Sequence, residues 1–311
     1  MENKVLNETQ HKDELDLREF FGILWSGRKK IFAITAAFAI VSVIYSLSLP
    51  NQYKATAILS PAQSDSADLS GALGQMGGLA SLAGVSLGSS ESTEAQIAQE
   101  IMQSWSFIEN FVSENNIEIE VYASEGWSRD SNELKIDPEL YDLETKTWLV
   151  KNINTGELGK PSSWELYQSF SERLSVSEDI ELGLVTLSIE HYSPYIAKQW
   201  LDLYIAAINK HMQERQVSKA TNNMNYLQAQ IEKTAIAEMR DIFYKLVEEQ
   251  VKNKMLAEAS PDYALVVISP SMLPEVKSQP SRAIICIIGT LFGFLLSMFL
   301  VLVIHYAKRS E

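Results

Sequence analysis

Two long apolar runs bracket the chain, and a mixed pattern of strands and amphipathic helices lies between them. The second run covers residues 283–306 without a charged residue, and Lys308 and Arg309 follow it. Its 24 residues exceed the roughly 20 that an α-helix needs to cross a bilayer. The first run covers residues 31–49 and is equally free of charge. We therefore predict transmembrane helices over 31–49 and 283–306.

A cleaved signal peptide is the alternative for the first run, because Ser46-Leu47-Ser48 loosely fits the small-x-small cleavage pattern. A signal peptide, however, has an apolar region of about 7–15 residues behind a short basic segment. Here the run has 19 residues, and the thirty residues before it include six acidic ones. The pattern therefore favours a retained membrane helix.

Positive charges next to the two runs predict how the chain crosses the membrane, since Lys and Arg tend to stay on the cytoplasmic side. Those before the first run include Lys12, Arg18, Arg28, Lys29 and Lys30. Lys308 and Arg309 follow the second run, whereas the inner flanks hold only Lys54, Lys277 and Arg282. We predict cytoplasmic tails over 1–30 and 307–311, with residues 50–282 forming one translocated domain.

The N-terminal tail contains a short amphipathic pattern. Apolar residues recur at i, i+3, i+4 and i+7, as Leu17, Phe20, Phe21 and Leu24. Such a stripe opposite charged residues suits a helix that lies at the membrane surface. A cytoplasmic partner is the alternative occupant of the stripe, and we favour the membrane surface.

Alternating apolar and polar positions predict strands in the translocated domain. Residues 52–60 follow the first membrane run, and residues 263–268 form an apolar, buried strand ahead of the second, so these two are expected to lie side by side. Residues 180–192 give the strongest strand pattern, and residues 117–122 also alternate. The apolar positions of the strongest strand are Leu182, Leu184, Leu187 and Ile189.

Capping signals predict two shorter helices. Thr93 followed by Gln96 fits a capping box and opens an amphipathic helix through about Ser113. Ser162 with Glu165 supplies the same signal for a helix ahead of the strongest strand.

The longest helical region begins with Ser193 as N-cap and Pro194 at the first helical position. From there to about Glu258 the chain contains no Gly and no further Pro. As one straight rod it would reach about 100 Å. One hinged helix, or two antiparallel helices that turn within residues 216–240, fits the pattern equally. Because the heptad order is imperfect, we favour helices that pack side by side in an assembly over a dedicated coiled coil.

Residues 64–93 are rich in Gly, Ser, Ala and Leu. The regular spacing of their Leu residues and Met76 indicates a loose helix or loop that packs on another surface, and disorder of part of it is the alternative.

Charge and cysteine content narrow the class of the domain. Residues 51–281 hold 17 Lys and Arg against 33 Asp and Glu, a net charge near −16. Phosphate binding needs positive charge, so we expect no nucleic-acid partner. The only cysteine, Cys286, lies in the second membrane run, which leaves the domain without a disulfide. The predicted fold is therefore an α+β domain with long helices and no disulfides, anchored by two transmembrane helices.

No motif for catalysis or metal binding is present. The four histidines are scattered along the chain without zinc-ligand spacing. Neither a phosphate-binding loop nor a G-x-S-x-G elbow occurs. We therefore expect no enzymatic activity, no cofactor and no metal.

Three prolines precede the second membrane run. Pro270, Pro274 and Pro280 restrict φ and disfavour α geometry in the residue before each of them. We predict that residues 269–282 form an extended, semi-rigid strut of polyproline II character, which fixes the height and tilt of the domain.

Small residues form a narrow face in the second run. Gly289, Gly293 and Ser297 follow one another at steps of four. Small residues at this spacing allow close contact between membrane helices, although glycine is also ordinary in such helices. We expect this face to meet another helix, which is the first span of the same or a neighbouring chain, or a polymerase.

Several of these segments resemble the Wzz-type chain-length determinants, the polysaccharide co-polymerases of Gram-negative inner membranes. The similar segments are DLREFFGILWSGRKKI, YKATAIL, GQMGGLASLAGVSLG and YKLVEEQVKNKMLAEASPDYALVVISPSMLPEVKSQPSRAI. The resemblance implies a periplasmic domain with a membrane-proximal α/β base and long helices, in a ring of identical subunits. It also implies that the protein sets the modal length of O-antigen or a related glycan made by a Wzy-type polymerase, with a lipid-linked glycan as a possible partner.

Two departures from relatives bear on the function. Some relatives add a cytoplasmic tyrosine kinase domain and a C-terminal tyrosine cluster, and neither is present here, which favours the plain regulator. No residue of the family motif is catalytic, so the resemblance implies only structural roles for Pro270, Pro274, Pro280, Gly289 and Gly293. The alternatives are an export scaffold for capsule or exopolysaccharide that works with a separate tyrosine kinase, and a two-span periplasmic sensor.

Overall fold

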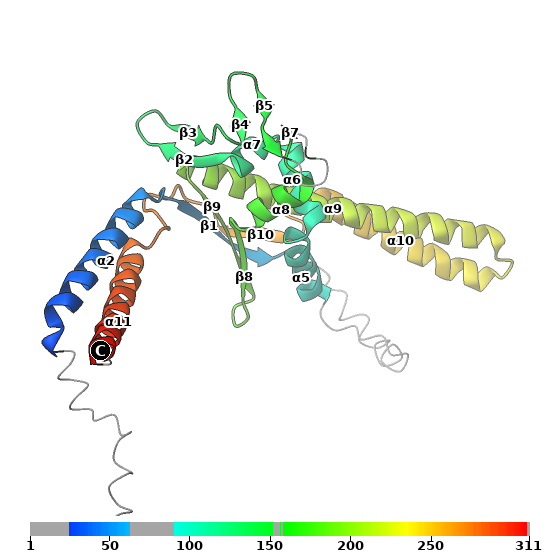
Figure 1. Ribbon diagram of the computed structural model, residues 1–311. Helices are drawn as coiled ribbons and strands as arrows, with labels where there is room; N and C mark the ends of the chain where they lie inside the picture. Colours follow the sequence, from blue (N-terminus) through cyan, green and yellow to red (C-terminus); the bar gives the residue numbers. More distant parts are fainter. Residues whose placement is uncertain (1–24, 63–89, 152–155, 157, 310–311) are drawn as a thin grey trace, which may run out of the picture. The chain divides into compact units, whose positions relative to one another are not determined.

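The computed structural model of the chain describes residues 25–62, 90–151, 156 and 158–309. It divides into two compact units, one made of residues 1–50 with 279–311 and the other of residues 51–278. Figure 1 shows the elements of both. The predicted amphipathic helix of the tail and most of the Gly/Ser/Ala/Leu segment lie outside the described residues.

The first unit contains the two predicted membrane helices. Helix α2 covers Arg28–Ser48 and helix α11 covers Arg282–Arg309. Both are long and apolar enough to cross a membrane, with mean hydropathies of 2.1 and 2.7 over the qualifying segments. The two helices pack along each other within this unit.

The second unit is built on a four-stranded antiparallel sheet with the order β10-β1-β9-β8. The strands are β1 (Tyr53–Pro61), β8 (Leu174–Asp179), β9 (Leu184–His191) and β10 (Leu265–Ser269). The predicted pairing of the strands that adjoin the membrane helices is confirmed, since β1 and β10 are antiparallel neighbours. Strand β1 thus lies between partners that are far from it in sequence.

One face of the sheet forms the core. Side chains alternate across a strand, so residues two apart share a face. On β1 the buried side chains are Ala55, Ala57 and Leu59, and on β9 they are Val185, Leu187 and Ile189, each at most 1% exposed. Helix α9 (Pro194–Lys233) packs against both strands. Helices α5 (Ser90–Met102), α6 (Trp105–Glu114) and α8 (Ser163–Ser171) also contribute to the core, as does Val121 of the short α7 (Glu118–Tyr122).

Aromatic rings join these helices. The ring of Tyr204 on α9 lies 4.7 Å from that of Phe111 and 5.5 Å from that of Phe170, measured between centroids. Its hydroxyl donates a hydrogen bond to the carbonyl of Met102, so the polar end of this buried side chain is satisfied. The core therefore holds α5, α6 and α8 against α9.

A buried amide connects α9 to strand β10. The side chain of Asn209 donates to the carbonyl of Leu265 at 2.8 Å. Its oxygen accepts from the backbone N–H groups of Ala264 and Leu265, at 3.0 and 2.9 Å. Three hydrogen bonds from one side chain thus fix the start of the edge strand on the helix.

The long helical region is a hairpin of two helices. Helix α9 covers Pro194–Lys233 and helix α10 covers Ala237–Ala259, and they pack side by side (Figure 1). The backbone is extended at Thr234 and Ile236, where the turn lies within the predicted range. Of the two alternatives that the sequence left open, one hinged helix or two antiparallel helices, the structure shows the antiparallel pair.

Five local predictions are corrected by the structure. Residues 117–122 are not a strand, because the main-chain N–H groups of Val121 and Ala123 bond four residues back and form helix α7, Glu118–Tyr122. Thr93 is not an N-cap, since α5 already begins at Ser90. The predicted single helix is two, and Ser104 caps the second by accepting from the N–H of Phe107.

The other corrections concern the strands. Leu182 lies outside β9 and is 69% exposed. Strand β10 is an edge strand in which only Leu265 is buried, so it is not the buried strand that its apolar sequence predicts. By contrast, the capping box of Ser162 and Glu165 is present in full at the start of α8.

Short hairpins occupy most of the segment between α7 and α8. The pairs are β2 (Ser124–Ser128) with β3 (Glu133–Ile136), β4 (Tyr141–Asp142) with β5 (Thr147–Trp148), and β6 (Val150–Lys151) with β7 (Leu158–Gly159).

His191 should make the stability of this unit depend on pH. Burial, with Arg173 nearby, lowers the pKa of His191 to about 3. Its Nδ1 accepts the N–H of Ser193 at 3.1 Å, which holds the ring neutral. Below its ordinary pKa, near 6.5, only the unfolded chain takes up this proton, so stability falls as pH falls. Between pH 7.5 and pH 5 the loss from this residue should be about 2 kcal/mol.

Urea unfolding of the detergent-solubilised protein, followed by tryptophan fluorescence at both pH values, measures this loss. In His191→Asn, which can still accept from Ser193, the pH-dependent loss should be smaller by that amount. An equal loss in the variant and the wild type would assign it to other groups.

Candidate functional site

The predicted small-residue face of α11 packs against α2. A Cβ atom added at Gly289 would lie 2.5 Å from the Cβ of Ser42, and one at Gly293 would lie 2.4 Å from the Cβ of Phe38. Real Cβ atoms do not approach this closely, so both glycines are needed for the observed separation of the helices. The structure therefore brings the glycines to one helix contact in the same chain.

Ser297 extends the same contact by one turn. It is fully buried, and its hydroxyl lies 3.5 Å from that of Thr35 on α2. The hydroxyls of Ser42 and Ser297 also donate to carbonyls of their own helices, Ala39 and Phe294, at 2.8 and 2.7 Å. Polar groups in lipid need such partners, and these bonds allow serine in a close-packed face.

Pro270 and Pro274 lie in a segment, residues 270–278, that other parts of the second unit hold in place, whereas Pro280 belongs to the first unit. Residues 270–278 contain no helix or strand. The hydroxyl of Ser271 donates to the carboxylate of Asp202 on α9. At the other end, the backbone N–H of Ser278 donates to the carbonyl of Gln52 at 2.8 Å. The segment is therefore attached at both ends, and its prolines are not the only restraint on it.

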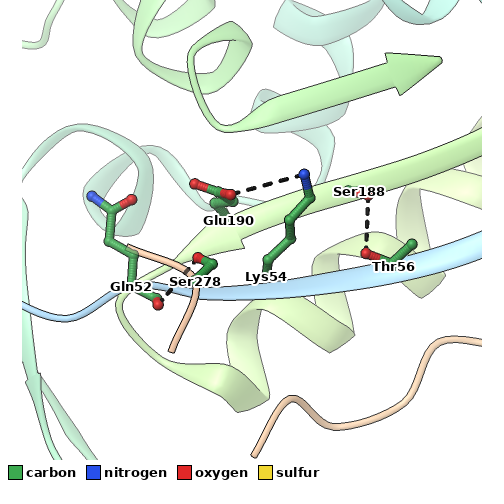
Figure 2. A network of polar contacts seen from close by, with 6 residues as sticks. All are labelled: Gln52, Lys54, Thr56, Ser188, Glu190 and Ser278. Atoms are coloured by element: carbon green, nitrogen blue, oxygen red, sulfur yellow. Dashed lines mark hydrogen bonds and ion pairs between the residues drawn. The ribbon is translucent and has the colours of Figure 1, made fainter. Parts of the chain in front are cut away.

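Polar contacts continue from this attachment across the sheet (Figure 2). The hydroxyls of Thr56 on β1 and Ser188 on β9 lie 3.0 Å apart. The ammonium of Lys54 lies 4.0 Å from the carboxylate of Glu190 on the same pair of strands. These contacts link neighbouring strands on the face of the sheet opposite the core.

No sequence pattern identifies the residues that anchor the proline segment. Asp202 belongs to a helix and Gln52 and Ser278 are separated by most of the domain, so their proximity depends on the fold. For α2, the small residues Thr35, Ser42 and Ser46 were a usable signal, because they recur on one side of an apolar helix.

Within the described ranges, no group of three or more His, Cys, Asp or Glu residues could hold a metal ion.

The helix contact predicts a crosslink. In a Cys286→Ala background, Thr35→Cys with Ser297→Cys should form a disulfide under mild oxidation, because the two hydroxyls lie 3.5 Å apart. Adding Gly293→Leu should lower the yield severalfold, since its side chain would displace Phe38. Adding Leu291→Ala, whose parent side chain is 57% exposed, should leave the yield unchanged.

A protease site inserted at residues 234–236 makes an intrachain crosslink visible on a non-reducing gel, where the two cleaved pieces stay joined. A crosslinked dimer in its place, or an undiminished yield in Gly293→Leu, would contradict the helix contact described above.

Comparisons with known proteins bear on the family. The model of the family described as Wzz, chain length determinant protein, matches residues 13–115. No curated protein matches the chain. A solved structure described as a full-length bacterial polysaccharide co-polymerase has 12% identity and a TM-score of 0.39, with 94% of this chain and 99% of that one covered. A fragment of WzzB, a polysaccharide co-polymerase from Salmonella Typhimurium, has 13% identity and a TM-score of 0.28, with 74% and 100% covered.

The matched region contains helix α2, strand β1 and helices α5 and α6. These are one of the membrane helices, the central strand of the sheet and two core helices. The family match therefore confirms, over residues 13–115, the resemblance of this chain to the Wzz-type chain-length determinants, the polysaccharide co-polymerases.

Proposed function

We propose that this protein regulates the chain length of a polysaccharide of the O-antigen type, as an oligomeric scaffold in the bacterial inner membrane that acts with a Wzy-type polymerase. The observation that carries the proposal is the match of residues 13–115 to the chain length determinant family. The arrangement of one mixed domain between two membrane helices is consistent with it.

Exposed apolar side chains on the hairpin support self-association. Ile242, Tyr244, Met255 and Leu256 on α10 are each about half exposed or more. A single chain leaves this apolar surface in water, and contact between copies would remove it. In the proposal these side chains contact neighbouring copies.

The flanking charges support the orientation. Lys and Arg lie at and before the N-terminal end of α2 and at the C-terminal end of α11, which in the proposal places both termini in the cytoplasm and residues 50–282 in the periplasm. The protein then acts by geometry, because many identical copies present the same surface to a growing glycan. Such a mechanism requires each domain to be mounted in the same way.

Complementation of a deletion strain tests the proposed function. Deleting the gene should replace a modal distribution of surface glycan lengths by a broad one on a gel, and the wild-type gene should restore the mode. An unchanged length distribution in the deletion strain would overturn the proposal. Loss of capsule or exopolysaccharide with unchanged O-antigen length would instead support an export scaffold.

The prolines should act through the mounting of the domain. Replacing Pro270, Pro274 and Pro280 by alanine should broaden the glycan distribution while the protein stays in the membrane, because the segment gains backbone freedom. Pro261→Ala, in the exposed connection between α10 and β10, is the control and should keep the parental mode. Parental modality in the triple variant, at parental protein level, would show that the prolines are dispensable.

A further inference from the structure

An aromatic cleft of about 520 Å³ lies in the second unit, where four segments of the chain meet. Strand β1 contributes Tyr53, the β2–β3 hairpin contributes Trp127, and the start of α9 contributes Tyr195. The proline segment contributes Pro274 and Glu275. Its volume is within the range of roughly 300–1,000 Å³ that is usual for small-molecule sites.

The three rings are arranged around Trp127. Its ring centroid lies 5.8 Å from that of Tyr53, nearly perpendicular at 84°, and 6.3 Å from that of Tyr195, at 59°. None of the three belongs to the buried core, and Tyr195 is 52% exposed. Aromatic side chains that cluster outside the core, beside a cavity, are available to a ligand.

The tryptophan is held in place before any ligand arrives. Its indole N–H donates to the side-chain oxygen of Asn132 at 3.0 Å, across the hairpin. Asn132 has a φ of 55°, in the left-handed region, which asparagine tolerates better than most residues. Tyr53 opens a strand that pairs with β9, and Tyr195 lies in the first turn of α9. The rings are therefore mounted on regular elements, which limits the entropy lost on binding.

Polar groups complete the lining of the cleft. Arg129 can donate hydrogen bonds, Glu275 can accept them, and the amide of Asn132 can do both. The opposite charges of Arg129 and Glu275 give the lining no excess of either sign. A ligand with an apolar face and hydroxyl groups at its edge fits this combination, and a sugar ring has both.

A second cavity serves as a contrast. It measures about 860 Å³ and is lined largely by polar side chains of α5 together with Glu178, His211 and Arg215. It has no Trp or Tyr in its lining, so it offers no flat apolar surface against which a sugar ring could stack.

We propose that the cleft binds a pyranose unit of a glycan, stacked on Trp127 and hydrogen-bonded by Asn132, Arg129 and Glu275. The identification of the glycan as the regulated polysaccharide rests on the proposed function. In sequence, Tyr53 follows the end of α2 by five residues, and Glu275 precedes the start of α11 by seven. This proximity along the chain to both membrane helices suits a glycan that is still attached to its lipid carrier.

Binding to the full-length protein in nanodiscs tests the proposal. The first probe is the oligosaccharide released by mild acid from the surface polysaccharide of the host strain, added free and measured by calorimetry. The second is the lipid-linked glycan fraction of the same strain, incorporated into the nanodiscs and measured by co-purification. Binding of either probe supports the site, and the two probes distinguish a free glycan from a membrane-linked one.

Trp127→Ala should weaken binding at least about tenfold, as expected when an aromatic anchor is lost. Trp164→Ala, which removes a tryptophan that is 61% exposed on α8, is the matched control and should bind like the wild type. If Trp127→Ala fails to fold, Tyr195→Ala replaces it, because that side chain is half exposed, and it should also weaken binding.

Absence of binding of both probes by the wild type would overturn the proposal, as would equal binding by the wild type and the cleft variants. Either result is distinguishable from failure of the proposed function, because glycan modality in the deletion strain is measured without reference to the cleft. A protein can regulate length without this site, in which case the deletion changes the gel and the probes do not bind.

Discussion

The pairing of β1 with strands far away in sequence is the interaction on which the rest of the second unit depends. Strand β1 bonds to β9 on one side and to β10 on the other. Closing the long loops between β1 and these partners costs chain entropy. Burial of the side chains of Ala55, Ala57 and Leu59 against α9 offsets this cost. Because Ser278 also bonds to Gln52, the chain enters and leaves this unit at one place.

The close packing of α2 and α11 rests on a different principle from the packing of the second unit. Lipid is as apolar as the side chains of these helices, so burial of apolar area adds little to their association. Glycine and serine allow backbone approach, and at Gly289 and Gly293 the facing atoms leave no room for a Cβ. Ile287 and Leu291, which are 65% and 57% exposed, therefore have little part in choosing the partner face, whereas the small residues define it.

The sequence predicted those features that depend on local pattern. The membrane helices, the neighbouring strands beside them and the capping box of Ser162 all follow from periodicity or from short motifs. Residues 117–122 were misassigned because Ile117, Ile119 and Val121 alternate, and a helix of five residues is too short to show its own period. The hydrogen bonds of Asn209 to the start of β10 could not be predicted, because an asparagine on a helix gives no sign of a partner 56 residues away. The aromatic cleft was missed for the same reason, since four distant segments form it.

The proline segment connects the mounting of the domain with the cleft. Pro274 and Glu275 line the cleft, and the same segment is attached to α9 through Ser271 and to β1 through Ser278. To move away from Tyr53 and Trp127, the segment would have to break the hydrogen bond of Ser271 or that of Ser278. Restricted φ at Pro274 adds to this restraint from within the segment. These two hydrogen bonds and the restricted φ therefore hold in place the segment that lines this side of the cleft.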